Sequence, residues 1–151
     1  MSVDKLYLED FSVGQRFHLG SRSLDEASIL AFAREYDPQP FHLDHAAAKA
    51  SIYGGLIASG WQTMSTFMRL CVDGLLLRTH SMGSPGVETV RWPAPVRPGD
   101  RLTASLTVTE VRPSKSKPEL GFVRNTGTMV NQTGETVLTF EGALMVRRRP
   151  A

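Results

Sequence analysis

The sequence predicts an α+β domain, in which helices fill most of the first half and antiparallel strands fill the second half. Apolar residues recur at steps of three and four before residue 76, which is typical of amphipathic helices. After Gly86 the apolar residues alternate with polar ones, which is typical of strands with one buried face. Short links between these strands favour antiparallel pairing. We therefore expect a sheet that covers one long apolar helix.

Length and composition fit a single domain over 1–151. The chain has 151 residues, of which 41% are hydrophobic, enough to bury one core but too few residues for two enzymatic domains. Its single cysteine, Cys71, excludes an internal disulfide and a Cys-based zinc site. A cytoplasmic location is therefore expected.

Targeting, membrane and nucleic-acid signals are not apparent. The stretch 1–11 mixes charges into what would have to be an apolar leader, and the window 61–77 is too polar and too short to span a bilayer. The net charge is only +2, and no basic stripe with interleaved aromatics is present, so a nucleic-acid partner is not expected. Two basic clusters are present, Lys115 with Lys117 and the run 147–149. We interpret them as solvated surface or as contacts to the phosphate of a small molecule.

The first half contains a strand and two helices before the long helix. Residues 15–23 read as the strand, and Ser23 with Glu26 forms a capping box that would begin a helix over 24–36. Prolines 38 and 40 end that helix and predict a stiff, extended segment. A short helix begins near Asp44 and is interrupted at residues 54 and 55.

The long helix begins at Ser59, where Ser59 and Gln62 form a second capping pattern. Its predicted apolar stripe, interpreted as core, contains Trp61, Met64, Phe67, Met68, Cys71 and Leu75. Four strands follow, over 87–92, 102–109, 119–131 and 135–147.

The densest group of reactive side chains lies between the first helix and the short one. Asp37 and His42 are five residues apart on a segment stiffened by two prolines, and such a pair can divide acid and base work on one water. Two other interpretations remain open. Asp37 and Asp44 could be helix-boundary residues with His42 on the surface, or these three residues with His45 could ligate a metal, although no recognised metal motif is present.

The segment 32–61, FAREYDPQPFHLDHAAAKASIYGGLIASGW, resembles the hydratase motif of MaoC-like dehydratases and (R)-specific enoyl-CoA hydratases. The usual motif reads D-x-N-P-[aliphatic]-H-x-D and is followed by a glycine that opens the central helix. The stretch R-W-x-x-P-V-R-P-G-D at 91–100 is also similar to this family. Two positions depart from the pattern: Gln39 replaces the usual Asn, and Phe41 replaces a smaller aliphatic residue.

The resemblance implies a hot dog fold, an antiparallel sheet wrapped around one long helix. It also implies that Asp37 and His42 are the catalytic residues and that the Gly60 N–H helps to form the oxyanion hole. The implied reaction is reversible syn addition of water to a trans-2-enoyl thioester, giving an (R)-3-hydroxyacyl thioester. Asp37 would accept a proton from water. An unperturbed carboxylate is a weak base, so partial burial that raised the pKa of Asp37 would help. As the first residue after the Ser59 cap, Gly60 would have a free N–H.

No separate cofactor or metal is expected for this reaction. Coenzyme A or the phosphopantetheine of a carrier protein would be part of the substrate. Gln39 and Ser59 are expected near the substrate, and the candidate cations for its phosphates are Arg91, Arg97, Lys115 and Lys117.

The alternatives are a hot dog thioesterase, in which water attacks the thioester carbonyl, and a non-catalytic module that binds acyl thioesters. Fold alone does not separate these functions. The Asp37 and His42 spacing favours hydration, because thioesterases of this fold as a rule lack it. The resemblance also implies a homodimer or a dimer of dimers with sites completed across the interface.

Overall fold

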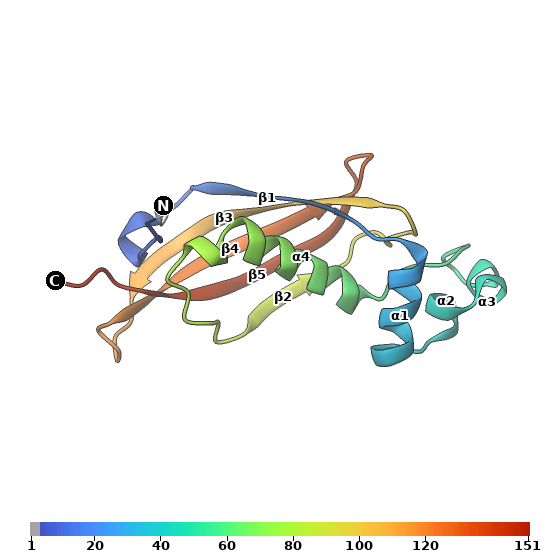
Figure 1. Ribbon diagram of the computed structural model, residues 1–151, viewed down its shortest axis with the longest axis horizontal. Helices are drawn as coiled ribbons and strands as arrows, with labels where there is room; N and C mark the ends of the chain where they lie inside the picture. Colours follow the sequence, from blue (N-terminus) through green and yellow to red (C-terminus); the bar gives the residue numbers. More distant parts are fainter. Residues whose placement is uncertain (1–3) are drawn as a thin grey trace.

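The structure is a computed structural model that describes residues 4–151. A five-stranded antiparallel sheet in the order β1-β3-β4-β5-β2 lies against the long helix α4, and three shorter helices gather at one end (Figure 1). The strands are β1 (Arg16–Ser23), β2 (Val87–Arg91), β3 (Arg101–Pro113), β4 (Leu120–Val130) and β5 (Thr136–Arg147). The helices are α1 (Glu26–Tyr36), α2 (Pro40–Leu43), α3 (His45–Ala50) and α4 (Gly60–Gly74), with the 3-10 turns η1 (Leu8–Asp10) and η2 (Leu76–Arg78). This arrangement confirms the predicted α+β class and the hot dog fold.

The alternation of β3 explains how the sheet faces α4. Leu102, Ala104 and Leu106 are buried, whereas Thr103 lies on the exposed face between them. Period-two burial of this kind puts all apolar side chains of the strand on one side. The core therefore lies between the sheet and α4.

The predicted apolar stripe of α4 is only partly buried. Phe67, Cys71 and Leu75 lie in the core, but Trp61 is 60% and Met68 46% exposed. The buried face is rotated toward polar residues, including two threonines whose hydroxyls donate to backbone carbonyls one turn earlier: Thr63 to Ser59 at 3.4 Å, and Thr66 to Gln62 at 2.8 Å. Because these hydroxyls are satisfied within the helix, they can be buried without a partner from the sheet.

The predicted start of α1 is wrong by two residues. Ser23 remains in β1, where it pairs with Arg101, and Asp25 is the N-cap, with its side chain accepting from Ser28 N at 2.8 Å. Sheet pairing thus holds the backbone at Ser23, and the next residue able to cap is Asp25.

The segment after α1 is more helical than the prolines predicted. Pro40 occupies the first turn of α2, where its fixed φ favours a helix and its missing N–H costs nothing. His42 therefore lies on a helical turn rather than on an extended loop. Asp44 caps α3, as predicted for the short helix, and accepts from Ala47 N.

Among residues 4–151, no helix combines the length and apolar character needed to cross a bilayer.

Candidate active site

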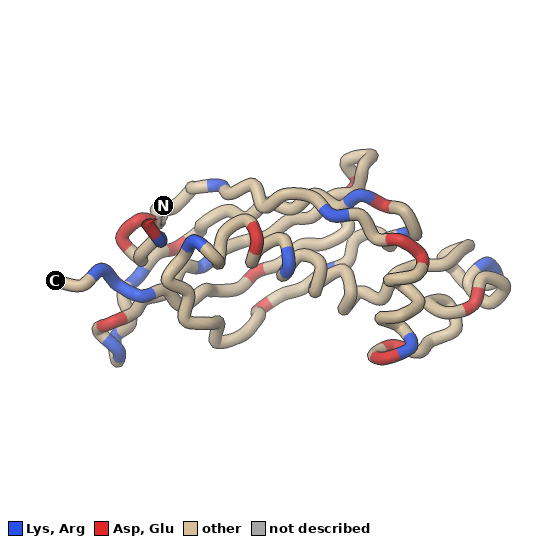
Figure 2. The backbone as a smooth tube through the Cα atoms, in the orientation of Figure 1, with Lys and Arg blue, Asp and Glu red and all other residues tan. Residues whose placement is uncertain are grey.

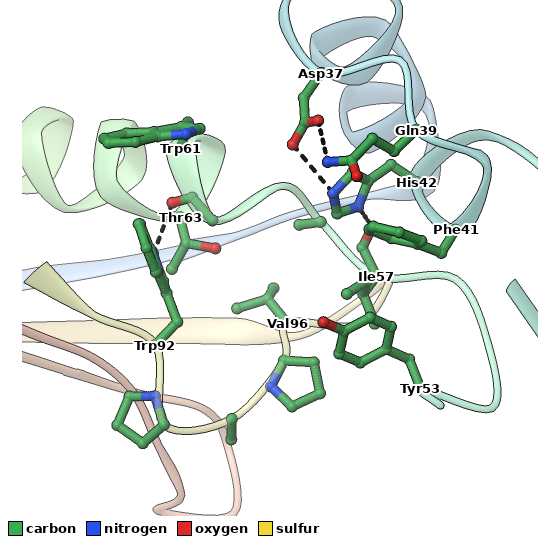
Figure 3. A pocket seen from close by; sticks show the side chains of 15 residues that line it. Asp37, Gln39, Phe41, His42, Tyr53, Ile57, Trp61, Thr63, Trp92 and Val96 are labelled. Carbon is green, nitrogen blue, oxygen red and sulfur yellow. Dashed lines mark hydrogen bonds and ion pairs between the residues drawn. The ribbon is translucent and has the colours of Figure 1, made fainter. Parts of the chain in front are cut away.

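A cavity of about 380 Å³ lies where three parts of the chain meet: the segment from the end of α1 through α2, the approach to α4 with its first turn, and the segment after β2 (Figure 3). Its polar lining includes Asp37, Gln39, His42 and Thr63. Its remaining lining residues are Phe41, Tyr53, Ile57, Ala58, Gly60, Trp61, Trp92, Pro93, Ala94, Pro95 and Val96. Most of the lining residues are thus apolar, with Asp37, Gln39 and His42 together on one side of the cavity and Thr63 beside the two tryptophans, a mixture that is usual for small-molecule sites.

Asp37 is the C-cap of α1, and its carboxylate has three polar neighbours. Gln39 Nε2 donates to Oδ1 at 2.6 Å, and the Ser59 hydroxyl donates to Oδ2 at 2.7 Å. His42 Nε2 lies 3.1 Å from the same Oδ2. The structure therefore brings Asp37 and His42 together in direct contact, as their spacing predicted.

The pKa of Asp37 is set by opposing influences. Burial is the largest single one and acts to raise the pKa. The hydrogen bonds from Gln39 and Ser59, together with His42, outweigh it and hold the pKa below the ordinary value of 3.8. The pKa of Asp37 is therefore lowered overall and not raised, because the carboxylate is buried together with donors that favour its charged form.

His42 is 4% exposed, and both of its ring nitrogens have a neighbour. Nδ1 lies 2.8 Å from the backbone oxygen of Ile57. A carbonyl oxygen only accepts, so Nδ1 must carry a proton to make this hydrogen bond. Nε2 faces Asp37 Oδ2, and a proton held between these two atoms would make the contact a hydrogen bond. The pair is thus arranged to hold and exchange one proton at the cavity wall.

Gly60 is the first residue of α4, and its N-cap is Ser59, as predicted. The Ser59 hydroxyl oxygen accepts from Trp61 N at 3.3 Å rather than from Gly60. Within residues 4–151, the Gly60 N–H has no hydrogen-bond acceptor. A free N–H at the positive end of a helix that also borders the cavity is suited to stabilise developing negative charge.

The structure brings both predicted polar contacts, Gln39 and Ser59, to the site as partners of Asp37. Gln39 also lines the cavity, which keeps it available to a substrate. Ser59 is fully buried, and its hydroxyl contacts Asp37 and the first turn of α4. The longer Gln39 side chain still reaches the carboxylate, although the usual residue of the motif is Asn.

The structure does not bring the four predicted cations to the cavity. Arg97 donates to the backbone oxygen of Tyr53, a residue of the cavity lining, and Arg91 is exposed at the end of β2. Lys115 and Lys117 lie in the hairpin between β3 and β4, near the chain's C-terminal end (Figures 1 and 2). That hairpin is at the opposite end of β3 from the cavity, about 40 Å away at the usual rise of a strand.

The residues proposed as metal ligands have other partners. His45 contacts Glu26, and Asp44 caps α3. In the part of the chain that the structure describes, no group of three His, Cys, Asp or Glu side chains is arranged to hold a metal. Asp37 and His42 alone remain at the cavity.

Sequence reasoning missed much of the cavity wall, including Tyr53, Ile57 and Trp92. For Trp92, one local signal was available: it directly precedes Pro93, and Pro95 follows two residues later. Prolines at this spacing indicate a stiff, extended segment that presents its neighbouring side chains in fixed directions.

The comparisons with known proteins agree with this geometry. The profile of the MaoC like domain family matches residues 10–131. The (R)-specific enoyl-CoA hydratase of Rhodospirillum rubrum is 30% identical over 160 aligned residues, which cover 99% of this chain and 99% of that protein. The crystal structure of the MaoC-like dehydratase from Rhodospirillum rubrum has a TM-score of 0.86 and 43% identity, covering 97% of this chain and 99% of that one. The (R)-hydratase from A. caviae, involved in PHA biosynthesis, has a TM-score of 0.72 and 28% identity over 94% of this chain and 99% of that one.

Proposed function

The chain belongs to the MaoC-like domain family, and we propose that it is an (R)-specific hydratase that adds water reversibly to trans-2-enoyl thioesters. The single observation that carries this proposal is the arrangement of the Asp37 and His42 pair and the free Gly60 N–H around one cavity. Hydration needs a group to move a proton and a donor for the thioester oxygen. The lining of this cavity supplies both.

In the proposed reaction, a water molecule is held by Asp37 and His42 above Cβ of the substrate. Its oxygen bonds to Cβ while one of its protons passes to the Asp37 and His42 pair, and the π electrons move toward the thioester oxygen. The Gly60 N–H stabilises the negative charge there. The pair then donates a proton to Cα from the same side, which completes syn addition and restores the original charge state.

The low pKa of Asp37 fits the role of proton acceptor, because the carboxylate is ionised at neutral pH. The proposed reaction needs no separate cofactor. Coenzyme A or the phosphopantetheine of a carrier protein would enter as the thioester part of the substrate. No Lys or Arg is among the described residues that line the cavity, so the phosphates of such a substrate would lie outside it.

Crotonyl-CoA tests the proposal directly. Loss of the enoyl absorbance, with chiral analysis identifying (R)-3-hydroxybutyryl-CoA, is the expected result. Free thiol should be measured in parallel, because a thioesterase releases it and a hydratase does not. Thiol release at the rate of enoyl consumption would assign the protein to the thioesterases. Tight binding of the thioester without turnover would assign it to non-catalytic binding modules.

A further inference from the structure

Trp92 packs directly on the proposed oxyanion donor, although it takes no part in the acid and base pair. Its indole Nε1–H donates to the backbone oxygen of Gly60 at 2.8 Å (Figure 3). A Cβ built at Gly60 would lie only 2.7 Å from the nearest ring carbon of Trp92. The indole ring therefore occupies the space beside Gly60 that any larger residue would fill.

The segment that carries Trp92 is held against the approach to α4 at a second point. Ala58 N donates to the backbone oxygen of Val96 at 2.8 Å. Pro93 and Pro95 lie between these two contacts and restrict the backbone. The segment 92–96 is thus a stiff strap fixed at both ends to residues 58–60. It forms one wall of the cavity.

We infer that Trp92 is a positioning residue, which holds Gly60 so that its free N–H is directed at the thioester oxygen. The inference rests on the proposed function for its chemical meaning. Gly60 by itself is a flexible residue at the start of a helix, where the first turn is prone to fray. A hydrogen bond to its carbonyl and a ring against its Cα restrict that motion. Positioning matters because a preorganised donor is worth far more to a transition state than a mobile one.

The chain offers a matched comparison in Trp61. This residue lines the same cavity, and its ring meets that of Trp92 edge to face at a centroid distance of 5.4 Å. Among the described residues, the indole N–H of Trp61 makes no hydrogen bond, and the side chain is 60% exposed. Trp61→Phe therefore changes the cavity wall without removing a contact to the Gly60 carbonyl.

The first experiment needs no activity. The sequence has 2 tryptophans, so the indole region of a 15N–1H NMR spectrum should hold two signals, which Trp61→Phe and Trp92→Phe assign. We expect the Trp92 indole proton to exchange with water at least about tenfold more slowly than that of Trp61, because it is hydrogen-bonded. Equal exchange rates would contradict the hydrogen bond from Trp92 to Gly60 and so overturn the inference, whatever reaction the protein catalyses.

The second experiment measures kcat and KM separately for Trp92→Phe, which keeps an aromatic ring and loses the donor. We expect kcat to fall by about fivefold to tenfold with KM changed less than about twofold, because the lost contact acts in the transition state. Trp61→Phe should act mainly on KM. A rise in KM at unchanged kcat for Trp92→Phe would overturn the inference and make Trp92 a binding wall.

Melting temperatures separate a general structural role from positioning. The inference requires that Trp92→Phe keep a melting temperature within about 4 °C of the parent, which corresponds to the loss of one hydrogen bond in a domain of this size. A larger fall that accounts for the lost kcat would overturn it. If the parent protein itself fails to hydrate enoyl thioesters, the proposed function fails, and the NMR experiment still decides whether Trp92 restrains Gly60.

Discussion

At the scale of single residues, the site depends on how the Asp37 charge is balanced. Burial penalises the carboxylate, and the donors Gln39, Ser59 and His42 compensate. A buried group with fewer donors would have a raised pKa and would lose its proton only at higher pH. The three contacts thus keep a partly buried carboxylate in its basic form.

Gln39→Met tests this balance with a side chain of similar length that cannot donate. The pKa of Asp37 should rise, because burial then meets one opposing hydrogen bond fewer. Asp37 works in its ionised form, so kcat/KM declines as the pH falls through its pKa, and this acid limb should move to higher pH. The pH profile of kcat/KM is the measurement. Gln39→Asn, which restores the usual residue of the motif and keeps an amide donor, is the control; an acid limb unmoved in Gln39→Met would contradict the assignment.

The same shift has a consequence for stability. Because the pKa of Asp37 is lower in the folded protein than the ordinary 3.8, its contribution to stability is present above that pH and is lost as the pH falls through the folded value. Gln39→Met should therefore reduce the free energy of unfolding at pH 7 and have less effect in strong acid. Urea unfolding at several pH values measures this difference.

Asp37→Asn and His42→Gln should each lower turnover by about a hundredfold or more, the usual scale for a positioned acid or base. Both residues lie at the cavity in direct contact. His42 is also buried and hydrogen-bonded to the Ile57 carbonyl, so its substitution should lower the free energy of unfolding more than substitution of an exposed loop residue would. Turnover should be compared at matched folded fraction, checked by circular dichroism. Near-normal turnover in either variant would remove that residue from the mechanism.

Gly60 requires a test that allows for its neighbour. Gly60→Pro removes the N–H at a helix position that tolerates proline, and Gly60→Ala is its comparison because alanine keeps the donor. The structure shows that alanine is not neutral here, since its Cβ would press on the Trp92 ring. We therefore expect both single variants to be impaired. In the Trp92→Leu background, where the space is opened, Gly60→Pro should remain at least about tenfold slower than Gly60→Ala, as loss of an oxyanion donor requires.

The residues of the site differ in how far the sequence alone could predict them. Asp37 and His42 are five residues apart, so local stiffness brings them together and a motif records their spacing. Trp92 meets Gly60 across 32 positions of the chain, and only the sheet and the strap place it there. The sequence alone could not predict the lowered pKa of Asp37 either, because that pKa depends on the hydroxyl of Ser59, 22 positions away in the chain.

At the scale of elements, local patterns predicted the strands well and the helix boundaries less well. The alternation along β3 survives in the structure because one face of the strand packs on the core and the other meets solvent. In α4 the apolar pattern misidentified the buried face, because Thr63 and Thr66 satisfy their own hydroxyls and can replace apolar residues there. Apolar Trp61 and Met68 are consequently left at the surface.

The prolines predicted an extended segment where the structure has the helical turn α2. Pro40→Ala tests whether Pro40 favours this turn. Pro40 is exposed, so its replacement removes few contacts. It should nevertheless lower the free energy of unfolding by about 0.4 to 1 kcal/mol, because alanine gives the unfolded chain more conformations. Denaturant unfolding is the measurement, and unchanged or increased stability would show that Pro40 does not favour this turn.

At the scale of the whole molecule, the sheet and α4 leave apolar surface uncovered along one side. β2 is an edge strand of five residues, paired only with β5, and Val87 on it is exposed. Trp92 follows β2 directly and meets Trp61 at the start of α4, where Met68 continues the exposed face of the helix. An open strand edge beside exposed apolar side chains is typical of a surface that another chain covers.

We therefore expect the protein to form a homodimer through the β2 edge and the adjoining face of α4. Light scattering at micromolar concentration should give about twice the chain mass of 16.6 kDa, or about four times that mass if dimers pair. Val87→Lys combined with Met68→Lys should shift the mass toward the monomer, because each adds a charge that dimerisation would bury. Lysine at Thr103 is the matched control, since that residue is exposed on the outer face of β3, away from the β2 edge. A monomeric parent protein would contradict the prediction, and so would a double variant that stays dimeric while Thr103→Lys dissociates. Because the cavity lined by Trp61 and Trp92 lies beside this surface, dissociation should also weaken substrate binding, which a rise in KM of the double variant would reveal.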